Sequence, residues 1–165
     1  MQPRIENPVM TYPRAMKGLQ LLGEAAKQAG LPRTTALLVE LRASQINGCS
    51  VCVDMHSREL RAEGEPDERI LTVAAWRETP YFTDAERAAL ALTEAATRLA
   101  DHHDAVSDEV WDDAARHYDE PQLGALVLEI AAINAWNRIN ATTRQITGDW
   151  VNQWIPGAGE TAHAA

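Results

Sequence analysis

A cysteine pair and a nearby histidine are the residues of this sequence whose types and spacing could support chemistry. Cys49 and Cys52 form a C-x-x-C pair, and His56 follows four residues after the second cysteine. If a helix begins near Asn47 and Gly48, these offsets place both thiols and the imidazole on one helix face. The dipole and the free N–H groups of the first turn favour a thiolate at such a helix start. The stretch therefore predicts a redox-active dithiol.

Two other interpretations of the cysteine pair stay open, a metal site and a pair of inert buried thiols. A zinc site needs a fourth ligand, and the sequence offers few candidates: Asp54, His102, His103 or a residue of a partner chain. We expect no metal, because the second C-x-x-C that would have strengthened the zinc interpretation is missing. For His56, the alternative to a catalytic role is a core histidine bonded to a neighbouring carbonyl group.

Composition and charge narrow the classes of function. The 165 residues suffice for one domain with a real core, and the formal net charge is -9, with acidic and basic residues intermixed. Because no Lys/Arg cluster is present, we expect no nucleic-acid partner. The sequence shows neither a signal peptide nor a membrane-spanning run, so we expect a cytoplasmic protein without membrane contact. No nucleotide, flavin or haem motif occurs, and we expect no cofactor.

The elements that must position the thiols are expected to be helices. Apolar residues recur at helical spacing over 14–28, 32–46 and 121–147. Thr83 and Glu86 form a capping box, and Ser107 is suited to cap a further helix. Residues 76–82 are expected to form a loop.

The predicted fold class is all-α, with one helical domain of about six to seven helices over residues 15–150. Residues 1–14 contain three prolines and are expected to form an extended arm, and 151–165 a flexible tail. The apolar content of the last helix indicates burial on more than one side, which would suit an oligomer.

Several further stretches, together with the cysteine stretch, make the sequence resemble a known family. They are residues 41–56, 76–78, 82–83, 86–90 and 133–138. Their order and spacing resemble the carboxymuconolactone decarboxylase/alkylhydroperoxidase AhpD-like family over roughly residues 15–145. Any one piece alone would be a weak signal.

The resemblance implies a helical domain that assembles into trimers or hexamers and reduces hydroperoxides with its thiols. It further implies that Cys52 attacks the peroxide, Cys49 closes a disulfide and His56 serves as base or proton relay. An external dithiol or disulfide-reductase donor would then reset the pair. Helix-dipole reasoning alone favours Cys49 as the nucleophile, but the position of His56 and the resemblance favour Cys52.

The sequence departs from the family pattern at two positions. Leu37 stands where a glutamate is expected twelve residues before the first cysteine, and Val51 replaces a histidine inside the C-x-x-C. Glu40, one turn from Leu37, could substitute as a proton relay, or it could be a solvated surface residue. Glu94 could face the thiols from the other side, or it could be a surface charge.

Four aromatic residues could wall an apolar pocket for an organic peroxide, although aromatic residues are more often simply core. They are Trp76, Tyr81, Phe82 and Trp136.

The predicted function is that of a cysteine-based peroxidase or thiol–disulfide oxidoreductase acting on organic or hydrogen peroxides. A redox sensor or scaffold is the alternative, because loss of the two relay residues could weaken turnover. A decarboxylase-type lyase is a further alternative, which the cysteine pair disfavours.

Overall fold

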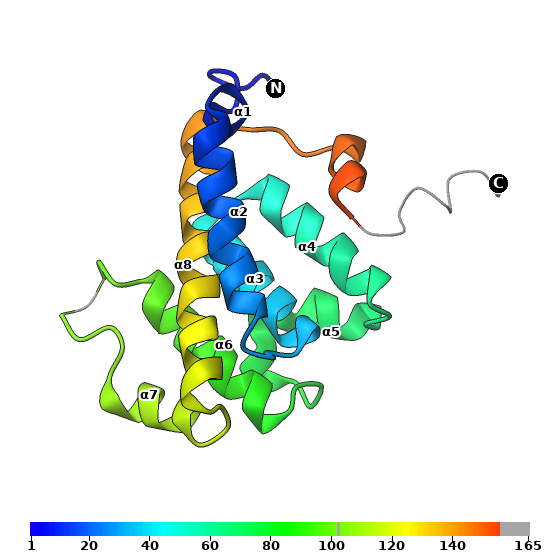
Figure 1. The fold of residues 1–165 in the computed structure, drawn as a ribbon. Coiled ribbons are helices and arrows are strands. Elements are labelled where there is room, and N and C mark those ends of the chain that lie inside the picture. The colour runs from blue at the N-terminus through cyan, green and yellow to red at the C-terminus, as the bar shows by residue number, and fades with distance from the viewer. Residues whose placement is uncertain (102, 156–165) are drawn as a thin grey trace.

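The computed structural model describes residues 1–101 and 103–155, and over these residues the chain is all-α, as predicted (Figure 1). The α-helices are α1 Pro8–Thr11, α2 Pro13–Lys27, α3 Arg33–Asn47, α4 Ser50–Ala62, α5 Asp67–Thr72, α6 Asp84–Thr97, α7 Asp108–Ala115 and α8 Glu120–Thr143. Two 3-10 helices, η1 Val73–Glu78 and η2 Asp149–Trp154, complete the described chain. The helices α2, α3, α4, α6, α7 and α8 correspond to those predicted, although α8 ends at Thr143 and not at residue 147. Each helix within the described ranges is too short or too polar to span a membrane.

Local sequence signals set the ends of the helices around the thiols. Gly48 ends α3 in the left-handed conformation, with φ 66°, which a residue with a side chain would adopt only with strain. This turn separates α3 from α4 and brings Cys49 to the start of α4. The predicted capping box of Thr83 and Glu86 is present at the start of α6, and Ser107 caps α7.

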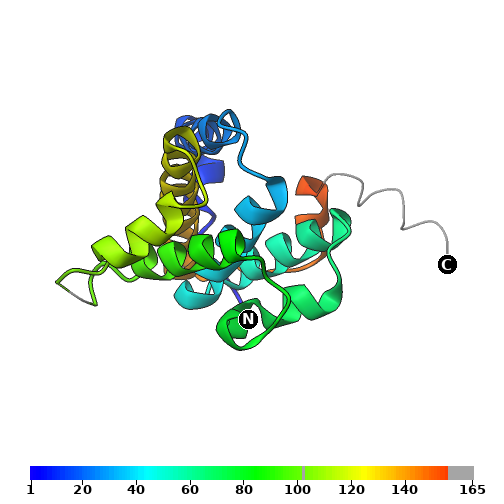
Figure 2. The ribbon, with the colours of Figure 1, turned by 90° about the horizontal axis from the view of Figure 1, so that it is seen from below.

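Helix α8 is the central element of the fold. It packs against α2, α3, α4, α6 and α7, and its buried side chains are not confined to one stripe. Helix α2 lies side by side with α8, whereas α3 lies between α8, α4 and α6 (Figures 1 and 2). The thiols of α4 therefore face helices that come from both halves of the sequence.

Three segments differ from the expected organisation. Residues 8–11 form the single turn α1, and Val9 is buried, so part of the expected extended arm is packed structure. The expected loop over 76–82 begins inside η1. Val151 in η2 is completely buried, so the first residues of the expected tail over 151–165 cover the core. Residues 156–165 lie outside the described chain.

Candidate active site

Cys49 occupies the N-cap position of α4, because this helix begins at Ser50 and not near Asn47 and Gly48 as predicted. Its backbone is extended, and its Sγ accepts a hydrogen bond from the backbone N–H of Cys52 at 3.4 Å. A sulfur atom in this position lies at the positive end of the helix dipole. The first turn of α4 therefore stabilises negative charge on Cys49.

The two thiols are free and form one buried pair. Their Sγ atoms are 2.6 Å apart, and each residue is only 1% exposed. A hydrogen bond from the Cys52 thiol lowers the pKa of Cys49 to about 7, aided by the Cys52 N–H and the nearby His56. The same contact, together with burial, raises the pKa of Cys52 above its usual range. The pair therefore loses its first proton near neutral pH, and the charge rests on Cys49.

Asparagines of α8 hold the pair from the other side. Asn140 donates to Cys52 Sγ at 3.5 Å, and its Oδ1 accepts from Asn7 of the N-terminal segment at 3.0 Å. Asn137 donates to Ser44 at 3.0 Å and accepts from Asn47 at 2.9 Å. Because each amide contacts a partner at both ends, the donor side of Asn140 is fixed toward the sulfur.

His56 is buried one turn after Cys52, between carboxylates. Its Nδ1 lies 2.8 Å from Glu59 Oε2 and 3.4 Å from Glu40 Oε2. Burial alone would lower the pKa of His56, but the two carboxylates outweigh it and raise that pKa. Its Nε2 is buried and has no hydrogen-bond partner in the part of the chain that the structure describes. His56 is therefore charged readily and has one nitrogen available for proton transfer.

A second unpaired atom lies beside His56. Glu40 Oε2 is buried and receives no hydrogen bond from the described residues, and Glu129 of α8 lies within hydrogen-bonding reach of the Glu40 carboxylate. Burial and the charge of Glu40 raise the pKa of Glu129 to about 8. We call Glu40, His56, Glu59, Glu129 and Arg33 the Glu40 cluster.

The Glu40 cluster is an ion-pair network, although its donor atoms are of types that bind metals. The donor atoms of Glu40, His56 and Glu59 lie within 4.8 Å of one another. Arg33, however, contacts Glu59 at 2.8 Å and Glu40 at 3.8 Å, so a guanidinium already supplies the positive charge that a cation would bring. The alternative zinc site at the cysteines would have used Asp54 or a histidine, but Asp54 is paired with Arg58, and His102 lies outside the described residues.

Glu94, one of the candidate relays, belongs to a different cluster. It accepts hydrogen bonds from Arg42 at 2.7 Å, Arg77 at 2.6 Å and Trp76 Nε1 at 3.0 Å, and Arg98 lies 3.6 Å away. Burial alone would raise the pKa of Glu94, but these donors lower it. We call Glu94 and these four partners the Glu94 cluster. Among the described residues, Glu94 contacts neither the thiols nor His56, so the structure does not bring Glu94 to the cysteines.

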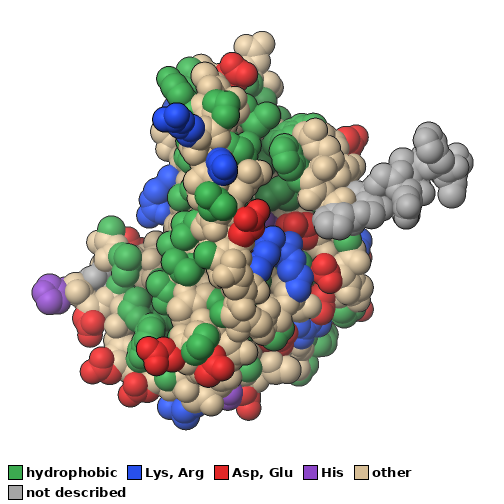
Figure 3. Space-filling view, in the orientation of Figure 1, with side chains coloured by type: hydrophobic (Ala, Val, Ile, Leu, Met, Phe, Trp, Pro, Cys, Tyr) green, Lys and Arg blue, Asp and Glu red, His purple; other side chains and the backbone are tan. Residues whose placement is uncertain are grey.

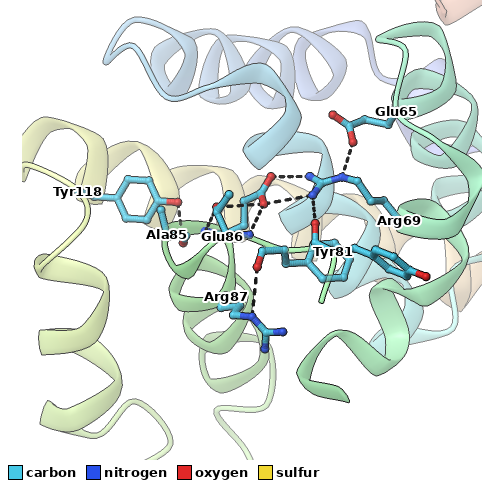
Figure 4. A network of polar contacts seen from close by, with 9 residues as sticks. Glu65, Arg69, Tyr81, Ala85, Glu86, Arg87 and Tyr118 are labelled. Atoms are coloured by element: carbon cyan, nitrogen blue, oxygen red, sulfur yellow. Dashed lines mark hydrogen bonds and ion pairs between the residues drawn. The ribbon is translucent and has the colours of Figure 1, made fainter. Parts of the chain in front are cut away.

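Figure 4 shows a similar saturated arrangement at the start of α6. Glu86 accepts from Arg69 at 2.6 Å and from the Thr83 backbone N–H at 2.8 Å, and Arg69 also contacts Glu65. Burial alone would raise the pKa of Glu86, but these donors lower it. This network ties α5 to the cap of α6.

The aromatic residues expected to wall one pocket are divided among three places. Trp76 and Phe82 are core residues, packed with Leu37 and Leu90, and Tyr81 is 43% exposed. Trp136 alone of the four packs beside the thiols, against the cluster of Ala43, Cys49, Val51, Cys52, Ile133 and Val151. A surface hollow of about 590 Å³ is lined instead by α1, α2 and Trp154. These aromatic residues therefore do not form a common pocket at the cysteines.

Sequence reasoning missed several residues of the site, among them Asn140, Glu59 and Glu129. Glu59 follows His56 at i+3 and so shares its helix face, a signal that local spacing could have revealed. Glu129 is a lone charged residue among the apolar residues of α8 between Leu123 and Ile133. A single carboxylate in such a stretch is costly to bury and indicates a specific partner.

Comparison with known proteins agrees with the resemblance seen in the sequence. Residues 13–95 match the carboxymuconolactone decarboxylase family. The chain belongs to this family. It is similar to the uncharacterized protein YdfG of Bacillus subtilis (strain 168), with 41% identity over 128 residues, which cover 78% of this chain and 86% of YdfG.

Solved structures of AhpD-like members of the family share the fold. A protein of unknown function from Agrobacterium tumefaciens, named in relation to the antioxidant defence protein AhpD, is 34% identical with a TM-score of 0.82; the match covers 89% of this chain and 99% of that chain. An AhpD-core, peroxidase-related protein from Ralstonia eutropha JMP134 is 16% identical with a TM-score of 0.75, covering 90% and 78% of the two chains. At that identity the second likeness shows the fold alone.

Proposed function

We propose that this protein is a cysteine-based peroxidase or thiol–disulfide oxidoreductase that reduces organic hydroperoxides or hydrogen peroxide. The observation that carries the proposal is the Cys49–Cys52 pair, in which one thiol has its pKa lowered to about 7. Such a thiol is largely ionised near neutral pH, and the thiolate is the reactive form. The carboxylate-supported His56 beside it can accept and return a proton.

The proposed reaction uses both thiols and balances without a cofactor. A thiolate attacks the terminal peroxide oxygen, the O–O bond breaks, and the alkoxide leaves with a proton while the cysteine becomes a sulfenic acid. The second thiol then attacks the sulfenic sulfur, and a disulfide and water form. An external dithiol donor exchanges with the disulfide and restores the reduced pair.

We assign the resting thiolate and the attack to Cys49, in contrast to the expectation from the resemblance. The Cys52 N–H and thiol both donate toward Cys49, whereas Cys52 has a raised pKa. Cys52 is then the resolving thiol, with Asn140 holding its sulfur in place. The pKa values belong to a coupled pair, so single-cysteine variants are needed to test the assignment.

Burial of the thiols limits which oxidants can react. Each cysteine is 1% exposed, and the buried Val151 of η2 packs in the same cluster. A hydroperoxide must therefore be small, or η2 must move to admit it. Slow access would also suit a redox sensor, and this burial is the observation that favours the sensor as the second candidate.

We further propose that the protein is a homo-oligomer, a trimer or a hexamer. Helices α1, α2 and α8 expose large apolar side chains, and Figure 3 shows hydrophobic side chains on the face that α2 and α8 present. They include Met10, Leu21, Val127 and Leu128. Such exposure on neighbouring helices is typical of a surface that a partner covers.

The test of the proposed function is oxidation of the reduced protein by hydrogen peroxide and by cumene hydroperoxide, followed by turnover with a dithiol donor. We expect loss of two thiols per chain, a Cys49–Cys52 disulfide by mass spectrometry, and continued peroxide consumption. Cys49→Ser and Cys52→Ser should each abolish disulfide formation within the chain. Disulfide formation without turnover would favour the sensor, and thiols that stay reduced with both peroxides would refute the redox function.

A further inference from the structure

Glu129 is a buried acid for which the reaction proposed above provides no role. It is 4% exposed, and it lies on α8 one turn before Ile133, which belongs to the same core cluster as the two cysteines. Isolated buried carboxylates are costly, and the group either finds a partner or takes up a proton. The charged side chain that raises the pKa of Glu129 most is another carboxylate, that of Glu40.

The charged groups around Glu129 do not compensate a second negative charge. Helix α3 contributes Glu40 and Arg33, and helix α2 contributes Lys27. Arg33 is engaged with Glu59, at 2.8 Å, and is farther from Glu40, at 3.8 Å. The α6 side chains in the adjoining core cluster are apolar: Ala88, Ala89 and Leu92. Two adjacent carboxylates in this setting cannot both be ionised without a large cost, so one proton is held between them.

The unpaired Glu40 Oε2 indicates where that proton lies. This atom is buried and lacks a donor among residues 1–101 and 103–155 as long as Glu129 is ionised. If Glu129 carries the proton, its O–H can donate to the Glu40 carboxylate. Glu40 in turn lies 3.4 Å from His56 Nδ1. A chain of proton-bearing groups thus runs from α8 through α3 to the histidine of α4.

We propose that Glu129 shares one proton with Glu40 and, through Glu40 and His56, supplies a proton to the alkoxide that leaves when the thiolate attacks a hydroperoxide. This inference rests on the proposed function. The new sulfur–oxygen bond forms as the oxygen–oxygen bond breaks, the alkoxide takes up the proton and becomes an alcohol, and the proton lost when the thiol ionised restores Glu129. Glu129 acts through Glu40 and does not touch the substrate.

Glu129→Gln is the variant that removes this proton with the least other change. The amide has the same shape and can still donate a hydrogen bond to Glu40, but it cannot titrate. Glu120→Gln is the matched control, because it makes the same substitution on the same helix at an exposed position. Three readouts are compared for the wild-type chain and both variants: the infrared band of protonated carboxyls as pH is raised, the rate of thiol alkylation by iodoacetamide, and the rate of disulfide formation with cumene hydroperoxide.

Alkylation and peroxide reduction both need access to a thiolate, but only peroxide reduction also needs a proton for the alkoxide. In Glu129→Gln we therefore expect disulfide formation to slow about 100-fold at neutral pH, with the alkylation rate nearly unchanged. Wild type should lose a protonated-carboxyl band near pH 8, and its peroxide rate per thiolate should fall over the same range. Glu129→Gln should lack both changes, and Glu120→Gln should show them as wild type does.

The opposite results would overturn the inference. These are a peroxide rate and pH profile in Glu129→Gln that match wild type, or a parallel fall in both rates, which a merely structural role would produce. A wild-type chain whose thiols alkylate but ignore hydroperoxide would instead refute the proposed function. In that case the infrared titration still decides, without any peroxide, whether Glu129 holds the proton.

Discussion

The Glu40 and Glu94 clusters are both built around buried glutamates, but they differ in how completely the carboxylates are paired. Glu94 receives hydrogen bonds from Arg42, Arg77 and Trp76, and its pKa is lowered. In the Glu40 cluster, Glu40 Oε2 lacks a donor among the described residues, and the pKa of Glu129 is raised to about 8. A saturated carboxylate stays ionised and holds helices together, whereas an incompletely paired one can exchange protons near neutral pH.

The two clusters also differ in their position relative to the cysteines. The Glu94 cluster joins α3, η1 and α6 away from the cysteines, and its aromatic member Trp76 is part of the core. The Glu40 cluster contains His56, one turn from Cys52, and the charge of His56 helps lower the pKa of Cys49. We infer that the first is structural and that the second tunes the thiols.

Glu40→Gln should give the largest effect on chemistry. It removes the carboxylate beside His56, so the pKa of His56 should fall and the relay to Glu129 should be cut. We expect disulfide formation with cumene hydroperoxide to slow about 100-fold at neutral pH, measured by thiol counting over time. Glu63→Gln, exposed after the end of α4, is the control. A Glu40→Gln chain that reacts as fast as wild type would show that the Glu40 cluster does not tune the thiols.

In the reduced protein, the contributions of Glu129 and Glu94 to the free energy of unfolding should change with pH in opposite directions. The folded-state pKa of Glu129 lies above its unfolded value, so its stabilising contribution is full below about pH 4.5 and is lost as pH rises through about 8. The folded-state pKa of Glu94 is lowered, so its contribution is present above about pH 4.5 and is lost as pH falls.

Denaturant unfolding at several pH values measures this contrast. The free energy of unfolding of Glu129→Gln relative to wild type should increase by about 5 kcal/mol between acid and alkaline pH, since only wild type ionises the buried acid. His56 titrates in both proteins and largely cancels in the difference. A difference that stays flat with pH would show that Glu129 is ionised throughout.

Glu94→Gln should have a smaller effect, and on stability alone. It leaves Arg42 and its neighbours facing a neutral amide, and since Arg77 is half exposed we expect a loss of about 2 kcal/mol in the free energy of unfolding. The rate of thiol oxidation in the folded protein should not change. A clear change in that rate would mean that Glu94 is coupled to the thiols after all.

Much of the fold could be predicted because its signals are local. Thr83 and Glu86 cap α6, Gly48 turns the chain before α4, and apolar residues recur at helical spacing along α8. The segments that were misjudged lack such signals. Residues 8–11 form only one turn, and η1 has a non-helical residue, Ala75, inside it.

The candidate site was predictable only in part for the same reason. Cys49, Cys52 and His56 are neighbours along one helix, so their spacing reveals them. Glu129 meets Glu40 across 89 positions of sequence, and no local periodicity reports such a contact. The same limit applies to Trp76 and Phe82, whose aromatic character could not distinguish a core from a pocket. Burial and partners, which decide these roles, are properties of the packed helices.

The most direct test of the central claim is a pH titration of thiolate absorbance in reduced wild type, Cys49→Ser and Cys52→Ser. We expect one thiolate to appear near pH 7 in wild type and to persist in Cys52→Ser, where the serine hydroxyl can still donate to Cys49. It should vanish in Cys49→Ser. A low-pKa thiolate that survives in Cys49→Ser and is lost in Cys52→Ser would contradict the assignment and return the attack to Cys52.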